Sequence, residues 1–205
     1  MPRTLVIDTA TAACSVALLG GERLIAAGHD VVGRGHAERL VPMIAALPDG
    51  GRADDILVDV GPGSFTGIRV GIAAARGLGL GWGVPVRGYS STSLLAAAAI
   101  ADGVPAPLAV VLEGGHGEVF MQGFVAPPLE PIDALVSLRP DAALVALAGR
   151  PAVGNGVRWL LQLDPALQAH EALPNASRAF LLPAALTNLP PRPLYGRAPD
   201  AKLPA

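Results

Sequence analysis

The stretch Gly61-Pro62-Gly63-Ser64-Phe65-Thr66-Gly67 lies between an apolar run, residues 56–60, and a segment rich in small residues, 68–81. This order predicts a strand, a tight turn and a helix. Glycine reaches backbone angles closed to other residues and proline fixes its own φ, while Ser64 can cap the helix. A helix start behind glycines can bind an anion. The stretch lacks the ending of a P-loop and the dinucleotide fingerprint, so it favours a close strand-to-helix connection.

The composition limits the kind of protein to which this turn belongs. The chain has 205 residues, enough for one large domain or two small ones. Hydrophobic residues make up 51% of it and aromatic residues only 4%, which is typical of helices packed closely on a sheet. The formal net charge is −2, without a run of lysines and arginines. A chain that binds nucleic acid by itself is therefore not expected, and any contact with RNA requires a partner.

Cys14 is the only cysteine, so no internal disulfide can form and a reducing cytoplasm is the expected compartment. We expect it to be a small buried residue. Asp8 interrupts the apolar run before it, and no basic-then-apolar leader is present. The longest weakly polar stretch, residues 67–86, carries Arg69 and Arg76. A membrane-spanning helix would hold these charges only at considerable cost, so no membrane segment is predicted.

The first half of the chain predicts three antiparallel strands followed by alternating helices and strands. The evidence is the period of the apolar residues and the turn residues between the runs. The predicted strands are residues 4–8, 14–19, 23–32, 56–60 and 84–87, and the predicted helices are 36–47, 64–81 and 92–101. A meander that feeds right-handed crossovers forms a mixed sheet with helices on it. This is the order of a ribonuclease-H-like half-domain, of which actin, Hsp70 and the sugar kinases carry two.

The second half predicts a shorter copy of the first. The predicted division is a first lobe, 1–102, a smaller lobe, 103–189, and a tail, 190–205, that returns to the first lobe. The smaller lobe is predicted to hold strands at 108–112, 118–125 and 152–153 and helices at 141–148, 157–163 and 176–189, the last interrupted by Pro183. The predicted fold class is therefore α/β, with two ribonuclease-H-like lobes of the actin/Hsp70 (ASKHA) type, mixed β-sheets and a shortened second lobe.

Asp8 and Thr9 are the candidate residues for a nucleotide site. They follow the first strand, at the position that faces the metal and the phosphates in the ATPases of this fold. The alternative is an acid and a hydroxyl that only tether the next turn, because both types bond readily to nearby backbone. The residues by themselves leave both interpretations open.

A second cluster consists of Glu113, His116 and Glu118, from which a metal or acid–base site can be imagined. The same residues fit an exposed hairpin tip, because glycines surround the histidine. The four histidines lack the paired spacing of a zinc protease helix, and Ser64 is not in a Gly-x-Ser-x-Gly elbow. We therefore assign no catalytic residue and no metal ligand.

The helix that begins at Ser64 is the candidate interface. Small residues recur every four positions from Gly67 to Gly79 and form a stripe that another backbone can approach closely. Packing on the parent sheet accounts for one face. A helix that is apolar nearly all round, in so small a lobe, predicts a second face against another subunit, with helix 36–47 as its companion. The predicted interface residues are His36, Arg39, Leu40, Met43, Phe65, Ile68, Arg69, Gly71, Ile72 and Ala75.

Several runs of the sequence resemble the bacterial TsaB (YeaZ) family. In the first lobe these are Asp8-Thr9 with Cys14-Ser15-Val16-Ala17-Leu18, residues 36–42 and residues 61–71. In the second half the resemblance thins to residues 118–120, 154–156 and 195–197. Glu113 stands where the family usually has an aspartate, and the second lobe is short for the family.

The resemblance implies a role in making threonylcarbamoyladenosine beside the anticodon of tRNAs. Proteins similar to TsaB are non-catalytic relatives of the transferase subunit TsaD, which they bind and activate together with the ATPase TsaE. TsaD carries a histidine pair after the strand equivalent to 84–87, whereas residues 89–95 here contain no histidine. The implied protein is a scaffold and activator that requires no cofactor, binds ATP or ADP weakly at most, and reaches tRNA only through the complex. In the family the two interface helices form a four-helix bundle with TsaD or with a second copy.

Two other functions stay open at this point. A small ATP-dependent kinase-like enzyme would use Asp8 and the cleft between the lobes. A metalloprotease of the glycoprotease type would require a zinc-ligand spacing that the sequence lacks.

Overall fold

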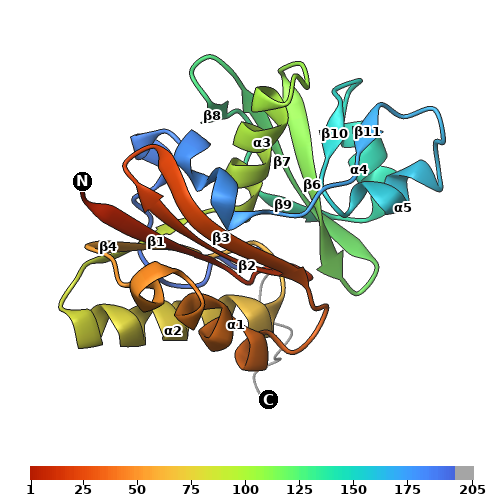
Figure 1. The fold of residues 1–205 in the computed structure, drawn as a ribbon. Helices are drawn as coiled ribbons and strands as arrows, with labels where there is room; N and C mark the ends of the chain where they lie inside the picture. Colours follow the sequence, from red (N-terminus) through yellow and green to blue (C-terminus); the bar gives the residue numbers. More distant parts are fainter. Residues whose placement is uncertain (197–205) are drawn as a thin grey trace, which may run out of the picture.

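The computed structural model describes residues 1–196, which form two mixed β-sheets with helices between and outside them (Figure 1). The elements of the first half are β1 (Arg3–Asp8), β2 (Ala13–Gly20), β3 (Arg23–Val31), α1 (His36–Ala45), η1 (Pro48–Gly51), β4 (Asp55–Asp59), α2 (Phe65–Trp82), β5 (Val86–Tyr89) and α3 (Ser91–Ala101). Their strands lie in the order β3-β2-β1-β4-β5, with β1, β4 and β5 parallel and the β1–β2–β3 meander antiparallel.

The second sheet has the order β11-β10-β6-β7-β8, and β9 pairs with β7 beside this path. Its elements are β6 (Leu108–Gly115), β7 (Glu118–Val125), β8 (Glu130–Pro131), β9 (Val136–Leu138), α4 (Pro140–Ala146), β10 (Ala152–Val153), α5 (Val157–Leu161), β11 (Ala169–His170), η2 (Ala176–Leu181) and η3 (Ala184–Leu186). The β6–β7 pair is antiparallel, whereas β10 runs parallel to both β6 and β11. None of the helices within residues 1–196 is long and apolar enough to cross a membrane.

The two faces of each sheet are covered by different helices. Leu5 and Ile7 of β1 point to the side of α1 and α2, while Val6 points to the side of α3 and η2. The helix α3 is buried on nearly every side, because it packs on the first sheet through Leu94 and on the second through Leu95. The outer face of the second sheet carries α4 and α5. The result is a stack of helix, sheet, helix, sheet and helix layers (Figure 1).

The helix α2 lies close to the end of β1 because glycines stand at positions 67 and 71, where the helix meets Thr9. A Cβ atom on Gly67 would lie 2.0 Å from the backbone oxygen of Thr9, and one on Gly71 would lie 2.4 Å from the Thr9 hydroxyl. The helix starts as predicted, since the Ser64 hydroxyl accepts a hydrogen bond from the Gly67 N–H. The stripe of small residues therefore packs on the parent sheet.

The chain after η3 returns to the first sheet. Leu189 exchanges two backbone hydrogen bonds with Gly88 at the edge strand β5, and Leu194 donates its N–H to Val60 at 2.8 Å. The Tyr195 ring stacks on Phe65 at the start of α2. Residues 197–205 of the predicted tail lie outside the described residues.

The predicted order of strands and helices is confirmed, with local differences. The strand predicted at 84–87 begins two residues later, because the Val84 N–H bonds back to Gly79 and stays with the end of α2, where Gly83 is left-handed. The interruption predicted at Pro183 is present, but the α-helix predicted at 176–189 is wrong, because the segments on either side of Pro183 are short 3₁₀ helices. Cys14 is fully buried, as expected, and burial raises the pKa of its thiol to about 11.

Two glycines of α2 give a stability test of the close helix–sheet contact. Gly67→Ala should lower the free energy of unfolding by about 1–3 kcal/mol, because the new methyl group has no room against Thr9. Gly77→Ala is the matched control, since nothing lies within 4 Å of its added Cβ and alanine favours a helix by about 0.5–1 kcal/mol. Urea denaturation of both variants measures the difference. Equal stabilisation by both would contradict the packing described here.

Candidate functional site

The turn between β4 and α2 is held by the buried carboxyl group of Asp59, the last residue of β4. Asp59 accepts the Gly61 N–H at 2.7 Å through Oδ1 and the Ser91 hydroxyl at 2.6 Å through Oδ2. The same hydroxyl lies 3.0 Å from the backbone oxygen of Pro62. One side chain therefore ties the strand β4, the turn and the first residue of α3 together.

A second buried carboxyl group lies beside Asp59. The parallel register of β1 and β4 pairs Ile7 with Val58, which makes Asp8 and Asp59 neighbours at the ends of their strands. Asp8 accepts the Tyr89 hydroxyl at 2.9 Å, and all three side chains are fully buried. Burial, together with the nearby Asp8 charge, raises the pKa of Asp59 well above its ordinary range. Burial also raises the pKa of Asp8.

These contacts place the two candidate nucleotide residues away from solvent. Asp8 is enclosed by the core, and the Thr9 hydroxyl donates to the Gly67 backbone oxygen at 2.8 Å. The Ser64 N–H at the start of α2 is one of the donors that a bound anion would need. It donates to the Ala10 backbone oxygen at 2.7 Å instead. Neither Asp8 nor Thr9 lines the pocket between the sheets. The residues present do not fit a bound nucleotide phosphate with its metal at this point.

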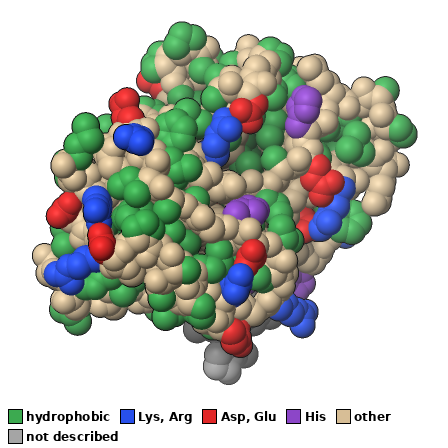
Figure 2. Space-filling model, in the orientation of Figure 1, with side chains coloured by type: hydrophobic (Ala, Val, Ile, Leu, Met, Phe, Trp, Pro, Cys, Tyr) green, Lys and Arg blue, Asp and Glu red, His purple; other side chains and the backbone are tan. Residues whose placement is uncertain are grey.

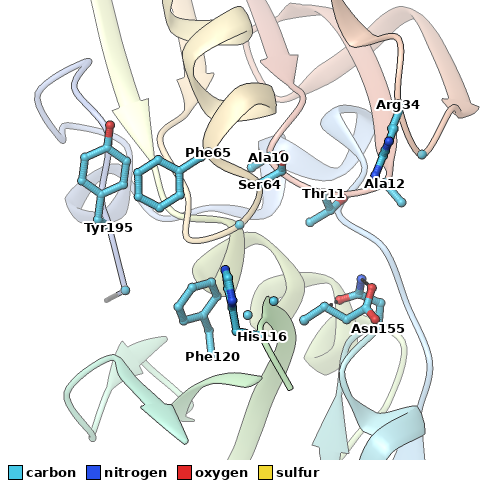
Figure 3. A pocket seen from close by; sticks show the side chains of 16 residues that line it. Ala10, Thr11, Ala12, Arg34, Ser64, Phe65, His116, Phe120, Asn155 and Tyr195 are labelled. Atoms are coloured by element: carbon cyan, nitrogen blue, oxygen red, sulfur yellow. Dashed lines mark hydrogen bonds between the residues drawn. The ribbon is translucent and has the colours of Figure 1, made fainter. Parts of the chain in front are cut away.

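The pocket between the two halves has a volume of about 550 Å³. The rings of Phe65 and Tyr195 lie face to face at one side of it, with Phe120 and His116 below, while Arg34 and Asn155 lie at the other side (Figure 3). The hairpin between β6 and β7 forms part of the wall. The residues that line the pocket are Ala10, Thr11, Ala12, Gly33, Arg34, Gly63, Ser64, Phe65, residues 113–116, Phe120, Asn155, Tyr195 and Gly196.

In the second cluster named from sequence, both glutamates bond to neighbouring residues, and Glu113 and His116 line the pocket. Glu113 forms an ion pair with Arg158 and accepts hydrogen bonds from Asn155 at 3.2 Å and from the Trp159 indole at 3.1 Å. Glu118 accepts the Ser137 hydroxyl at 2.7 Å. Within residues 1–196 no group of three or more His, Cys, Asp or Glu side chains could hold a metal ion.

Seven of the ten predicted interface residues lie inside the chain's own core. On α2, Ile68, Gly71, Ile72 and Ala75 face β1 and β4. The buried members of α1 are Leu40 and Met43, which pack in the same core, and His36, whose Nε2 lies 2.8 Å from the Thr11 backbone oxygen. These side chains hold the helices on the sheet and offer another subunit no surface. The exposed members are Arg39, Phe65 and Arg69. The interface itself stays a prediction.

The exposed sides of the same helices carry a second stripe, of which the sequence analysis named only Arg69 as an interface residue. On α2 it consists of Arg69, Ala73, Arg76 and Leu80, and on α1 of Glu38, Val41, Pro42 and Ala45. We call these eight residues the docking face; its α2 part lies on the β5 side of the helix, where Arg76 and Leu80 line a hollow with Val86 and Pro191. Leu80 is 88% exposed and Val41 62% exposed. Their spacing of three or four residues was visible in the sequence, but α2 has two such stripes, and only packing shows which one is inside.

Two mixed sheets with a buried helix between them, and strands that end at a shared cleft, define the class of ASKHA-like proteins. The structure matches that of YeaZ from Pseudomonas aeruginosa with a TM-score of 0.80 and 27% identity, over 95% of this chain and all of the other. The fold alone is shared with the ethanolamine utilization protein EutJ from Carboxydothermus hydrogenoformans, with a TM-score of 0.54 and 13% identity. The predicted fold class is confirmed.

Sequence comparisons identify the family. Residues 30–127 match the family described as TsaD: tRNA N6-adenosine threonylcarbamoyltransferase. An uncharacterized protein of Mycobacterium tuberculosis is 33% identical over 97% of this chain and 93% of its own length. The tRNA threonylcarbamoyladenosine biosynthesis protein TsaB of Escherichia coli is 37% identical over 58% of this chain and 53% of its own length. The chain belongs to the TsaB (YeaZ) family.

Asp59→Asn tests the buried carboxyl pair. Because the pKa of Asp59 is raised on folding, the folded chain holds a proton that the unfolded chain loses, and stability falls as the pH rises above the ordinary aspartate pKa of about 3.9. The side-chain amide of asparagine can still hydrogen-bond with the Gly61 N–H and the Ser91 hydroxyl, but it carries no charge. We expect the variant to melt at higher temperature than the parent at pH 8 and to differ little at pH 4.

Thermal unfolding followed by circular dichroism at both pH values measures the effect. Asp141→Asn is the control, because Asp141 is exposed on α4. A parent protein whose melting temperature is the same at both pH values would contradict a raised pKa at Asp59.

Proposed function

We propose that this chain is a non-catalytic scaffold and activator subunit in the synthesis of threonylcarbamoyladenosine on tRNA. It docks a TsaD-type transferase subunit through the docking face and acts with a TsaE-type ATPase in the cytoplasm. Family membership supports the pathway, since relatives in Escherichia coli, Haemophilus influenzae and Bacillus subtilis are named tRNA threonylcarbamoyladenosine biosynthesis protein TsaB. The chain reaches tRNA only through the complex, as its net charge of −2 favours.

The observation that carries the proposal is the exposed surface of α1 and α2. These helices lie side by side under the first sheet (Figure 1), and their inner residues fill the core. The outer residues Val41 and Leu80 remain largely in solvent although both are large and apolar. Paired helices with an apolar outer surface are the geometry that packs against a second pair of helices. A homodimer is the alternative use of the same face.

The proposal gives the chain no reaction step and no required cofactor. A kinase-like enzyme would have to present Asp8 and Thr9 to the cleft, and both are enclosed by β1, α2 and Tyr89. Residues 89–95, where the resemblance implies the histidine pair of TsaD, contain no histidine. Only Ser90 stands between β5 and α3, and the residues around it are buried.

Charges on the docking face should prevent assembly. Leu80→Asp and Val41→Asp are each expected to weaken binding to a TsaD-type subunit at least about tenfold, because a carboxylate would be desolvated against apolar helices. Val145→Asp is the matched control, since Val145 is 82% exposed on α4 of the other half. Binding is measured by calorimetry and folding by circular dichroism. Unchanged binding by both α1 and α2 variants would remove the docking face from the proposal.

Reconstitution tests the role in the pathway. Purified chain alone should transfer nothing to tRNA, whereas leaving it out of a mixture with the TsaD-type and TsaE-type subunits should abolish modification. Modified nucleoside is measured by mass spectrometry of digested tRNA. Threonylcarbamoyladenosine formed by the isolated chain, or formed equally well without it, would refute the scaffold role. The Val145→Asp protein serves as a surface variant that should restore full activity.

A further inference from the structure

Another pocket lies on the opposite side of the first sheet from the docking face. One wall is α3, and the other is the segment 170–175, which leads from β11 to η2. Both α3 and η2 pack on the face of the first sheet that α1 and α2 do not cover. The volume is about 410 Å³, within the size range of small-molecule sites. We call this cavity the α3 pocket.

The α3 pocket has an apolar floor and a polar rim. Leu95, Ala99 and Val153 line the floor, are at most 6% exposed, and belong to the core between α3 and the second sheet. The polar and charged residues of the lining are Asp102, His170, Glu171, Asn175 and Arg178. In the upper part of the face that Figure 2 views, neighbouring red and blue side chains and a purple histidine lie around green ones. An apolar cavity with a few polar groups is the usual composition of a small-molecule site.

Two residues of the rim hold hydrogen-bond donors that the chain does not use. Nη2 of Arg178 donates to Asp102 at 2.6 Å and to the Ala98 backbone oxygen at 3.3 Å, which fixes the guanidinium. Its Nε–H is buried without an acceptor among residues 1–196, and Nη1 has none there either. Asn175 accepts the Ser177 N–H through Oδ1, and its amide nitrogen has no partner in the same range. Because buried donors without acceptors are costly, these groups favour a ligand that carries a carboxylate.

The opposite kind of group comes from the segment 170–175. Glu171 forms no ion pair and no hydrogen bond in the part of the chain that the structure describes. Arg158 lies within electrostatic range of Glu171 but is itself paired with Glu113. The backbone of residues 171–174 also forms no hydrogen bond with any residue of 1–196, so its carbonyl oxygens are open. Carboxylate and carbonyl oxygens are acceptors for an ammonium group.

We propose that the α3 pocket binds an α-amino acid with an apolar side chain. The floor receives the side chain, Arg178 and Asn175 bind the carboxylate, and Glu171 binds the ammonium group. A zwitterion matches both kinds of unused group, whereas a simple anion or a simple cation would match only one. The inference goes beyond the proposed function, because the α3 pocket shares no residue with the docking face.

Leucine and its truncated analogues test this match. We expect saturable binding of leucine by isothermal titration calorimetry and a raised melting temperature, because the ligand binds only the folded chain. Isocaproate is leucine without its ammonium group and isoamylamine is leucine without its carboxylate. Each should bind at least about tenfold more weakly than leucine. Absence of saturable leucine binding, or analogues that bind as tightly as leucine, would overturn the inference.

The shape and polarity of the floor are tested by a pair of isosteres. Threonine replaces one methyl group of valine with a hydroxyl, which the apolar floor leaves without a partner. Valine should therefore bind several-fold more tightly than threonine. The same calorimetric titration measures both, and tighter binding of threonine would contradict an apolar floor.

Glu171→Gln assigns the ammonium group. The variant should bind leucine about tenfold more weakly and should bind isocaproate as the parent does, because isocaproate has no ammonium group. Glu130→Gln is the matched control, since Glu130 is an exposed glutamate on β8, at the opposite edge of the second sheet. Equal weakening of both ligands by Glu171→Gln would show that Glu171 does not bind the ammonium group.

Ala98→Leu fills the α3 pocket from its helical wall. Leucine binding should be lost, while the helix should form normally because leucine and alanine are both strong helix formers. Ala101→Leu is the control on the same helix, since Ala101 is exposed and does not line the pocket. Circular dichroism confirms that each variant folds. A folded Ala98→Leu protein that binds leucine as tightly as the parent would place the site elsewhere and refute the inference.

Discussion

The close contact between the end of β1 and the start of α2 governs the rest of this structure. The backbone oxygens of Thr9 and Ala10 occupy the space that side chains on Gly67 and Gly63 would fill. The helix can therefore lie directly on the sheet, and the buried Asp59 holds the turn before it through Gly61. The angle at which α2 leaves the sheet follows from these contacts, and with it the direction of the docking face.

The same arrangement recurs in the second half. A Cβ on Gly154 would lie 2.3 Å from the Val111 backbone oxygen, and one on Gly156 would lie 2.8 Å from the backbone of Leu112. In both halves backbone of a central strand, or of the residues that directly follow it, thus lies against glycines at the start of a helix. The first half also encloses Asp8 and Thr9. We therefore place the proposed function on the outer surface of α1 and α2.

The returning segment after η3 connects parts of the molecule that are distant in sequence. Leu194 bonds to the end of β4, Tyr195 stacks on α2, and Gly196 lies against Phe120 of the second sheet. Tyr195 therefore lies between the pocket and the docking face. The hydrogen bond from Arg69 to Tyr195 spans 126 residues of sequence.

The sequence by itself determined the order of the elements, the Ser64 cap, the burial of Cys14 and the family, because these depend on local periodicity and short motifs. Tertiary packing decided which stripe of α2 is inside. Gly71 and Ala73 are both small and belong to stripes of similar apolar character, so only the contact with Thr9 shows that Gly71 faces inward. Packing also enclosed Asp8, whose position after a strand was equally consistent with a nucleotide site. The partners of Asp8 and Arg69, Tyr89 and Tyr195, come from remote segments, and their meeting is a property of the folded chain.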